Sequence, residues 1–293
     1  MAGKSYSMLW RLVALCTAGL SGLAAPATGA DLEPATRAAF DRYVQRTEAQ
    51  MNSELARHEP FLWIERLPPD RRVEADRQVR AGQIVVQRLG TWDENSSGDR
   101  VKPVSVPGGM IHHWIGTVFI PGASLAQTLA FEEDYDRHAN YFRPDVMRSK
   151  ILQHNGNDFV IELRLYKKKV ITTVLDTEHQ VHYTLVDSTR ARSRSRSTRI
   201  QEVDDAGKPD ERLEPVGHDH GFLWRMNTYW RFEQGNGGTY VECESVSLTR
   251  DIPAGLGWLI GPYVTSVPRE SLIFTLAATR AAVLQRISLR AAE

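Results

Sequence analysis

The chain has 293 residues, and its 36 basic side chains are balanced by 36 acidic ones. This balance argues against a protein that binds nucleic acid or an anionic membrane with its whole surface. The length is sufficient for one sizeable hydrophobic core and an additional segment.

The N-terminus carries Lys4 and Arg11, and no acidic residue precedes Asp31. A short apolar stretch follows Arg11, and small residues lead up to Ala30. This order of positive charge, apolar core and small residues is typical of a secretory signal peptide. The apolar stretch is shorter than the roughly 20 residues that span a bilayer. We therefore predict that residues 1–30 are a cleaved signal peptide and that the protein is periplasmic or secreted.

Two cysteines occur in the chain, and cleavage would remove Cys16 and leave Cys243. A single cysteine cannot form an internal disulfide, so stability must come from a packed core. Since we find no second apolar run of about 18 residues, we predict that no segment spans a membrane after cleavage.

The first elements are helical. Apolar residues recur at helical spacing over residues 33–58, and Pro60 lies just past the end. Residues 69–80 are a second, highly charged helix candidate. We treat residues 31–81 as an N-terminal helical extension, followed by a loop-like stretch rich in Gly, Ser, Asp and Pro over residues 91–109.

From residue 110 the pattern changes to strands. A strand over 110–120 precedes a predicted helix over 124–142, which Ser124 would cap. Further strands are predicted over residues 159–168, 170–186, 190–203, 222–232 and 239–249. Between them, residues 204–220 are polar and acidic and predict a surface loop.

The C-terminus predicts a long amphipathic helix with Pro268 in its first turn. Its apolar residues fall on one arc of the helix: Leu272, Ile273, Leu276, Ala277, Val283, Leu284 and Ile287. Strands in series, with helices segregated from them, indicate an α+β fold. A curved antiparallel sheet wrapped around this helix would bury one face of each.

Short segments spread over roughly residues 84–287 match those of a known family in the same order. They are His112–Gly116, Phe119–Leu125, Asp134–His138, Arg164–Val170, Arg190–Arg199, Phe222–Arg225, Ser247–Pro253 and Pro268–Leu272. Through them the sequence resembles the START-like helix-grip superfamily, which includes lipid-transfer domains and polyketide cyclases, and within it an uncharacterised bacterial exported branch.

The resemblance implies a helix-grip domain over residues 82–293, in which a curved antiparallel sheet wraps the C-terminal helix. It also implies a cavity between sheet and helix, and thus a lipid or another hydrophobic small molecule as the partner. It names no ligand.

Residues 222–232, taken as a strand, place large apolar side chains on one face. We predict that this face points inward, where it either lines a pocket or fills a core. The candidate ligand-binding residues are Trp114, Trp224, Met226, Trp230, Phe232 and Arg280. Arg280 falls inside the apolar arc of the final helix, so it anchors an anionic ligand group, snorkels to place its charge in water, or pairs with a buried acid.

A run of arginines with period two occupies one face of the strand over residues 190–203. It consists of Arg190, Arg192, Arg194 and Arg196, with small residues opposite. The arginines favour a solvated outer face paired with acidic side chains of neighbouring strands. The alternative is a cationic stripe for phosphates or anionic headgroups. The small serines on the other face would leave room in a cavity.

No motif predicts a catalytic residue, a cofactor or a metal. His218 and His220 flank Asp219 in a loop without a tethered third ligand, and the neighbours His112 and His113 point to opposite faces of a strand. Phosphate-binding loops, nucleophile elbows and zinc-protease motifs do not occur.

The sequence therefore favours a non-catalytic binding or carrier protein for a lipid or other hydrophobic molecule. The alternative is a cyclase- or aromatase-like enzyme that uses polar groups such as His112, Tyr229 or Arg280. A third interpretation is an interaction module whose core is filled.

The boundary at Ala30 gives the first testable prediction. N-terminal sequencing of the protein recovered from the periplasm or the medium is expected to begin at or near Asp31, because small residues precede the cut. An intact Met1 in that fraction would contradict the signal-peptide prediction.

Overall fold

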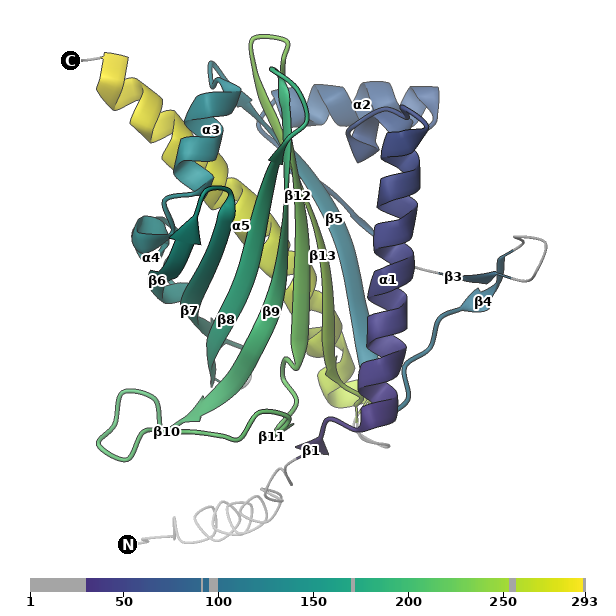
Figure 1. The fold of residues 1–293 in the computed structure, drawn as a ribbon, viewed down its shortest axis with the longest axis vertical. Coiled ribbons are helices and arrows are strands. Elements are labelled where there is room, and N and C mark those ends of the chain that lie inside the picture. The colour runs from purple at the N-terminus through teal and green to yellow at the C-terminus, as the bar shows by residue number, and fades with distance from the viewer. Residues whose placement is uncertain (1–29, 91, 95–99, 170–171, 253–256, 292–293) are drawn as a thin grey trace, which may run out of the picture.

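The computed structural model describes residues 30–90, 92–94, 100–169, 172–252 and 257–291. The predicted signal peptide thus lies outside the described residues, apart from Ala30. Figure 1 shows a large twisted sheet with a long C-terminal helix, α5, behind it and an N-terminal helix, α1, in front.

Among the described residues, the main sheet has nine strands in the order β2-β5-β13-β12-β9-β8-β7-β6, with β10 paired to β9. Every pairing in it is antiparallel. Its strands are β2 (Val85–Arg88), β5 (Gly109–Pro121), β6 (Val146–Asn155), β7 (Asp158–Lys168), β8 (Thr172–Leu185), β9 (Arg190–Asp204), β10 (Arg212–Leu213), β12 (Arg225–Gly235) and β13 (Gly238–Arg250). The five long strands that the sequence predicted after residue 158 are all present.

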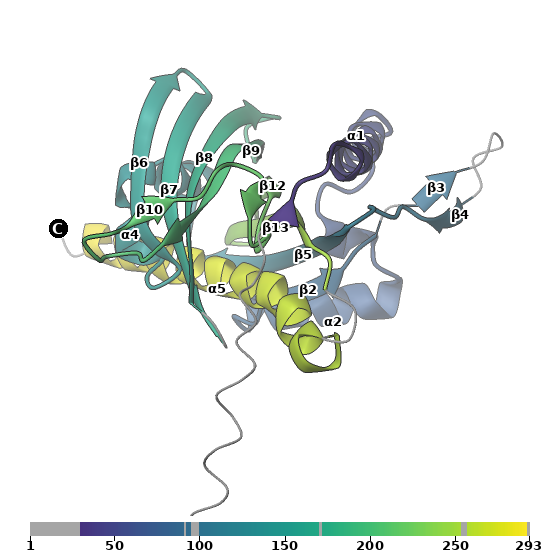
Figure 2. The ribbon, with the colours of Figure 1, turned by 90° about the horizontal axis from the view of Figure 1, so that it is seen from below.

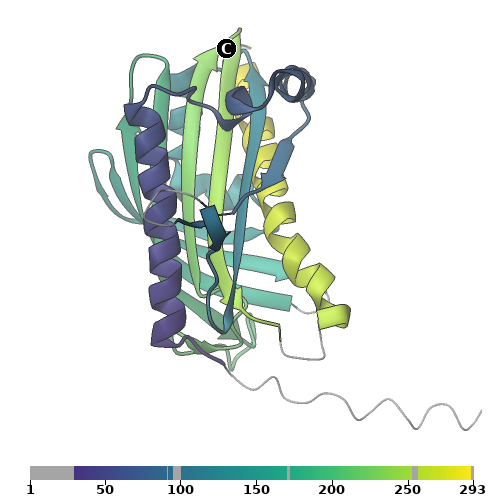
Figure 3. The same cartoon turned by 90° about the vertical axis from the view of Figure 1, so that its right-hand side faces the viewer.

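Side chains alternate between two faces along these strands. We call the face that meets α5 the inner face, where Val118, Phe232 and Val241 belong to one apolar cluster with Leu276 of α5. The opposite face, where Tyr229 and Val246 pack with Phe40 of α1, is the outer face. In Figure 3 the strands lie between the two helices.

Helix α5 (Gly257–Ala291) covers the inner face through Leu272, Leu276 and Val283. The predicted start at Pro268 is wrong, because the helix begins before it and contains that proline. By length and composition, Thr265–Arg290 is apolar enough to cross a membrane. The prediction of no further membrane span is thus not confirmed, although here the helix packs on the sheet (Figure 2).

The predicted single helix over 124–142 is instead three short pieces. They are α3 (Leu125–Glu132), the 3-10 turn η2 (Tyr135–Arg137) and α4 (His138–Tyr141). Ser124 caps α3 as expected, since its Oγ accepts from the Gln127 backbone N–H at 3.2 Å. Phe131, Tyr135 and Phe142 all belong to the inner apolar cluster.

Helix α1 (Pro34–Ala56) has nearly the bounds predicted over 33–58. It lies on the outer face of the sheet. Phe40, Tyr43 and Met51 of the helix pack with Val246 and Leu248 of β13. A separate apolar cluster holds the 3-10 turn η1 (Trp63–Arg66) and α2 (Pro69–Arg80) against Ile115 and Phe119 of β5. The extension therefore covers one face of the sheet.

Charged groups are buried beneath this extension. The Glu242 carboxylate, 1% exposed, accepts from the Arg231 guanidinium at 3.0 Å and from the Trp63 backbone N–H at 2.8 Å. Arg231 also lies 3.5 Å from Glu54 of α1. Burial raises the pKa of Glu242, and the charge of Arg231 opposes that shift.

Two further polar contacts join α1 to the sheet. Tyr43 Oη lies 2.8 Å from His113 Nδ1, and His113 Nε2 lies 2.7 Å from Glu244. The Tyr229 hydroxyl donates to Glu48 of α1 at 3.0 Å. Each bond joins one particular residue of α1 to one particular residue of the sheet, so together they fix the position of α1 along the strands.

The sequence missed several strands. The edge strand β6 was not predicted, and β3 (Trp92–Glu94) pairs with β4 (Arg100–Pro103) where a loop was expected. The two-residue strands β1 (Ala30–Asp31) and β11 (His218–Asp219) pair with each other. Such short or polar strands lack the alternating pattern that identifies longer ones.

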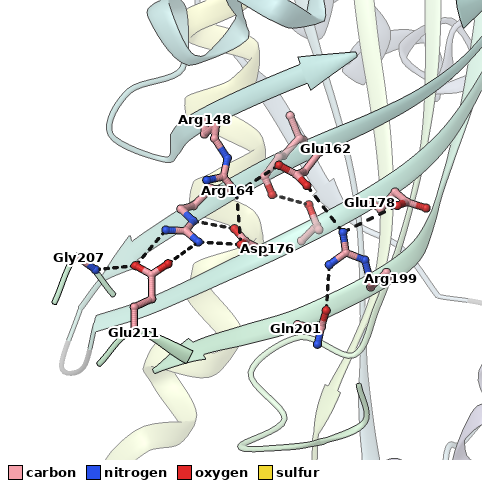
Figure 4. Close-up of polar contacts among 11 residues, drawn as sticks. Arg148, Glu162, Arg164, Asp176, Glu178, Arg199, Gln201, Gly207 and Glu211 are labelled. Atoms are coloured by element: carbon pink, nitrogen blue, oxygen red, sulfur yellow. Dashed lines mark hydrogen bonds and ion pairs between the residues drawn. The ribbon is translucent and has the colours of Figure 1, made fainter. Parts of the chain in front are cut away.

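The outer surface that α1 leaves uncovered carries an ion-pair network, drawn in Figure 4. Arg164 of β7 donates to both oxygens of Asp176 at 2.7 Å and to Glu211 at 2.8 Å. Arg199 of β9 lies 3.8 Å from Glu162 and from Glu178. This arrangement places charged pairs across β7, β8 and β9 at one end of the sheet.

The buried pair under α1 yields a stability prediction. Arg231→Met is expected to cost about 3–5 kcal/mol of unfolding free energy, since it leaves the Glu242 carboxylate buried without its cation. Urea unfolding followed by circular dichroism measures this loss. The control Arg77→Met removes an exposed pair on α2 and is expected to leave the unfolding free energy nearly unchanged. Equal losses in the two variants would contradict the assignment.

Candidate ligand-binding site on the inner face

One half of the inner face is closely packed. Phe232 of β12 lies opposite Val241 of β13 and Ala191 of β9, and Val241 lies opposite Val118 of β5. All four side chains are at most 2% exposed. This row is core, and it holds the predicted site residue Phe232.

The packing loosens along the strands. In the next inner row, Trp230 lies opposite Ser193 and Cys243, and Cys243 lies opposite Gly116. Trp230 is half-buried, and its ring is stacked with that of Phe232 at a centroid distance of 6.1 Å. A Cβ atom on Gly116 would lie 2.8 Å from Leu276 Cδ1, so glycine is needed for the close approach of α5.

From β9 to β5 the following inner row is half-buried, whereas Val181 of β8, the neighbour of Ser195, is buried. Its members in strand order are Ser195, Thr228, Ser245 and Trp114. Met226, also half-buried, comes next on β12, and its backbone N–H donates to Ser197 Oγ at 2.9 Å. The structure thus places Trp114, Met226 and Trp230 around a strip of small side chains, which we call the inner platform (Ser195, Thr228, Ser245, Trp114, Trp230 and Met226).

Trp224 does not join this platform, which corrects the prediction that it shares a face with Trp230. The strand begins at Arg225 rather than Phe222. Ahead of it Gly221 has a positive φ of 77°, and Trp224 packs into the α1 cluster, where its Nε1–H donates to Asp219 at 2.9 Å. The period-two rule fails because the chain bends before the strand starts.

Arg280 also lies away from the platform. Its Nε–H donates to the Phe119 carbonyl of β5 at 3.0 Å, and its guanidinium lies beside Gly82. The side chain therefore fastens α5 to β5. The partner is a backbone carbonyl, so the structure supports neither a pair with a buried acid nor a place at the platform, whereas a charged end that extends past the apolar surface fits the half-buried position.

A buried polar cluster at the packed end was not predicted. Thr279 of α5 donates to Glu132 of α3 at 3.2 Å, and the hydroxyls of Tyr135 and Tyr183 lie 2.8 Å apart. Burial raises the pKa of Glu132 to about 8. It also raises the pKa of both tyrosines above their ordinary value. At neutral pH the Glu132 carboxyl is therefore mostly protonated and able to donate a hydrogen bond.

His138 borders this cluster. Its ring lies 4.7 Å from that of Tyr135 and 5.0 Å from that of Phe142, between centroids. Burial lowers its pKa to about 4, so the imidazole is neutral at pH 7. Within the described part of the chain, His138 Nε2 has no hydrogen-bond partner. The sequence did not predict this cluster, because it indicated one continuous helix over residues 124–142 where the structure has three short pieces.

The other predicted polar candidates are engaged elsewhere. Burial, aided by the charge of Arg88, lowers the pKa of His112 to about 4, and its Nε2 lies 3.0 Å from Thr249 Oγ1. His112 and His113 point to opposite faces, as expected from alternation. In the loop motif, His218 contacts Asp31 at 2.6 Å and His220 contacts Glu202 at 2.7 Å.

This architecture is a helix-grip fold, an antiparallel sheet wrapped around a long C-terminal helix. No protein-family model matches the sequence. No curated protein matches it either.

The solved structures to which this chain is similar include the following three. A STAR-related lipid transfer protein of Xanthomonas axonopodis is 16% identical, with a TM-score of 0.39 over 61% of this chain and 95% of that one. The Zhui aromatase/cyclase of Streptomyces sp. R1128 is 14% identical, with a TM-score of 0.41 over 61% and 96%. Human STARD10 is 9% identical, with a TM-score of 0.39 over 76% and 85%.

The raised pKa of Glu132 gives a pH prediction. The folded protein keeps this proton up to about pH 8, whereas the unfolded chain releases it near the ordinary value of 4.5. The stability held by the protonated form is therefore complete below the ordinary value and is lost as the pH rises toward the folded value. As the pH rises across this window, we expect the unfolding free energy of Glu132→Gln to increase relative to that of the wild type by about 1.4 kcal/mol per pH unit.

Urea unfolding at mildly acidic and at neutral pH measures this difference. Glu74→Gln, which alters an exposed carboxylate on α2 paired with Arg77, serves as the control. A stability difference between Glu132→Gln and the wild type that does not change with pH would show that Glu132 is ionised in the folded protein.

Proposed function

We propose that this protein is an exported, non-catalytic binding or carrier protein for a lipid or another hydrophobic small molecule, held on the inner platform beside α5. The observation that carries the proposal is the change along the inner face. The row through Phe232 is closed, whereas the row through Trp114 and Thr228 is half-buried. Large apolar side chains that are only partly covered, next to small ones, provide a surface for an apolar ligand.

The chemistry of the platform favours a neutral ligand. Its members are two tryptophans, a methionine, two serines and a threonine, and none is charged. The serine and threonine hydroxyls supply hydrogen bonds for a polar end group such as a hydroxyl or a carbonyl. Arg280 is bonded to β5, so we do not assign it to a ligand's anionic group.

The enzyme alternative has less support. Of the three polar groups considered for it, Tyr229 lies on the outer face bonded to Glu48, and Arg280 is held by Phe119. Only His112 remains on the inner face, and its Nε2 is engaged by Thr249. A cyclase would need several polar groups directed at one bound chain, and the platform offers hydroxyls alone.

Export rests on the N-terminal residues. Lys4, Arg11 and the apolar stretch after them have the pattern of a signal peptide, and the first described strand begins at Ala30. A carrier outside the cytoplasm would take up its ligand after export, so we expect the recovered protein to hold one. Organic extraction followed by mass spectrometry identifies it.

The platform also gives a mutational prediction. Trp230→Ala is expected to weaken binding of a fluorescent fatty-alcohol probe about tenfold, because the ligand loses an aromatic contact surface. Its unfolding free energy should fall by less than the roughly 3–5 kcal/mol typical of a fully buried tryptophan, since one side of the ring is already without neighbours. Fluorescence titration and urea unfolding measure the two effects.

Trp224→Phe is the matched control. This change removes the hydrogen bond to Asp219 in the α1 cluster, so it should lower stability and leave probe affinity unchanged. The carrier proposal fails if the wild type binds no apolar probe and yields no extracted ligand. It fails also if the two tryptophan variants lose affinity equally.

A further inference from the structure

A groove of the described residues lies on the outer face of the sheet. Its volume is about 410 Å³. The floor is formed by β8 and β9, one wall by Glu48 of α1, and the other by the adjoining ends of β6 and β7. Its charged and amide side chains lie on the outer face, opposite to the inner platform, and Ser195 of β9 borders both. Figure 2 shows α1 standing beside the strands that form the floor.

The side chains of this groove are polar. Those that matter for its chemistry are Glu48, Asn155, Gln180, His182, Arg194 and Arg196. The carboxylate of Glu48 is already used, since it accepts from Tyr229 at 3.0 Å and lies 3.9 Å from Arg194. His182 is likewise paired with Asp158 at 2.7 Å.

Arg196 differs from Glu48 and His182, which have partners within the protein. Its neighbours across the strands are neutral, with Gln180 on β8 and Asn227 on β12. In the described part of the chain its guanidinium has no hydrogen-bond or ion-pair partner. Arg199, further along β9, is by contrast paired with Glu162 and Glu178 (Figure 4). In the predicted stripe, Arg190 pairs with Asp187 in the turn before β9 and Arg194 lies 3.9 Å from Glu48 of α1, so these partners are not the acidic side chains of neighbouring strands that the sequence favoured.

Other arginines beside the groove add positive charge. Arg192 lies directly opposite Arg231, and burial together with the charges of Arg194 and Arg231 lowers its pKa. Burial also lowers the pKa of Arg225, and Arg196 contributes to that shift. Like charges held this close repel one another, and an anion among them would relieve the repulsion.

We propose that this outer groove is a phosphate-binding site centred on Arg196 and Arg194. Arg196 presents planar pairs of donors, the geometry that matches phosphate oxygens, and Arg194, which already donates to Asn52 of α1, contributes its remaining donors two residues away on the same strand. The amides of Gln180 and Asn155 make no hydrogen bond within the described residues and supply further donors at the rim. The phosphate belongs either to a soluble phosphate ester or to a phospholipid headgroup.

Calorimetric titration of the purified protein with inorganic phosphate tests the proposal. We expect saturable binding that weakens about tenfold or more in Arg196→Ala, because a charged hydrogen-bond partner is lost. Arg196 is exposed, so this variant should fold as the wild type does. Arg196→Lys, which keeps the charge and loses the planar fork, should fall between the two.

Arg199→Ala is the matched control on the same strand and should bind phosphate as the wild type does. Two further titrations separate the sources, one with glycerol phosphate and one with phosphatidylcholine vesicles with or without phosphatidic acid. Preference for either source supports the site. The proposal is overturned if the wild type shows no saturable binding of any of these, or if Arg196→Ala and Arg199→Ala lose affinity equally. Trp230→Ala should leave phosphate binding intact, which separates this site from the inner platform.

Discussion

The central strands of this protein are covered on both faces, and that constraint determines most of the structure. β5, β13 and β12 have α5 on one side and the N-terminal extension on the other. A polar side chain on such a strand is shielded from water, so it must form its hydrogen bonds with other groups of the protein. Glu242 and Arg231 form a hydrogen-bonded ion pair. The Trp63 backbone N–H donates to Glu242 as well, and Glu54 is a second acidic partner of Arg231. The strands further along, β9, β8 and β7, lose the cover of α1 and carry solvent-facing ion pairs instead.

The same double cover explains why the two proposed sites differ in chemistry. On the inner face, the packing against α5 weakens toward Trp114 and Thr228, and the uncovered side chains are apolar or hydroxylated. On the outer face, the cover ends at Glu48, and the side chains beyond it are arginines. β9 contributes to both sites, with serines on one side and arginines on the other, because its side chains alternate.

Much of the fold could be predicted from the sequence, because the long elements have strong patterns. The bounds of α1, α2, β5, β7, β9 and β13 lie within a few residues of the predictions. The failures have local causes. Tyr135 and His138 follow a helical pattern but sit on separate short turns, whose breaks depend on tertiary packing. Trp224 obeys the strand period and still faces the other way, because the chain bends after Gly221. For Arg280 the sequence showed an unusual position but not its partner, a backbone carbonyl.

The attachment of α1 has a consequence for the order in which the chain can fold. Glu48 of α1 and its partner Tyr229 are 181 residues apart in sequence. During synthesis α1 leaves the ribosome long before β12 and β13 exist, and the outer-face contacts that hold it are therefore absent. Helix α5 is made last, so the inner face also stays uncovered until translation is complete. Pairing over such long separations is slow. The sheet can therefore gain the cover of both helices only after the whole chain has been made.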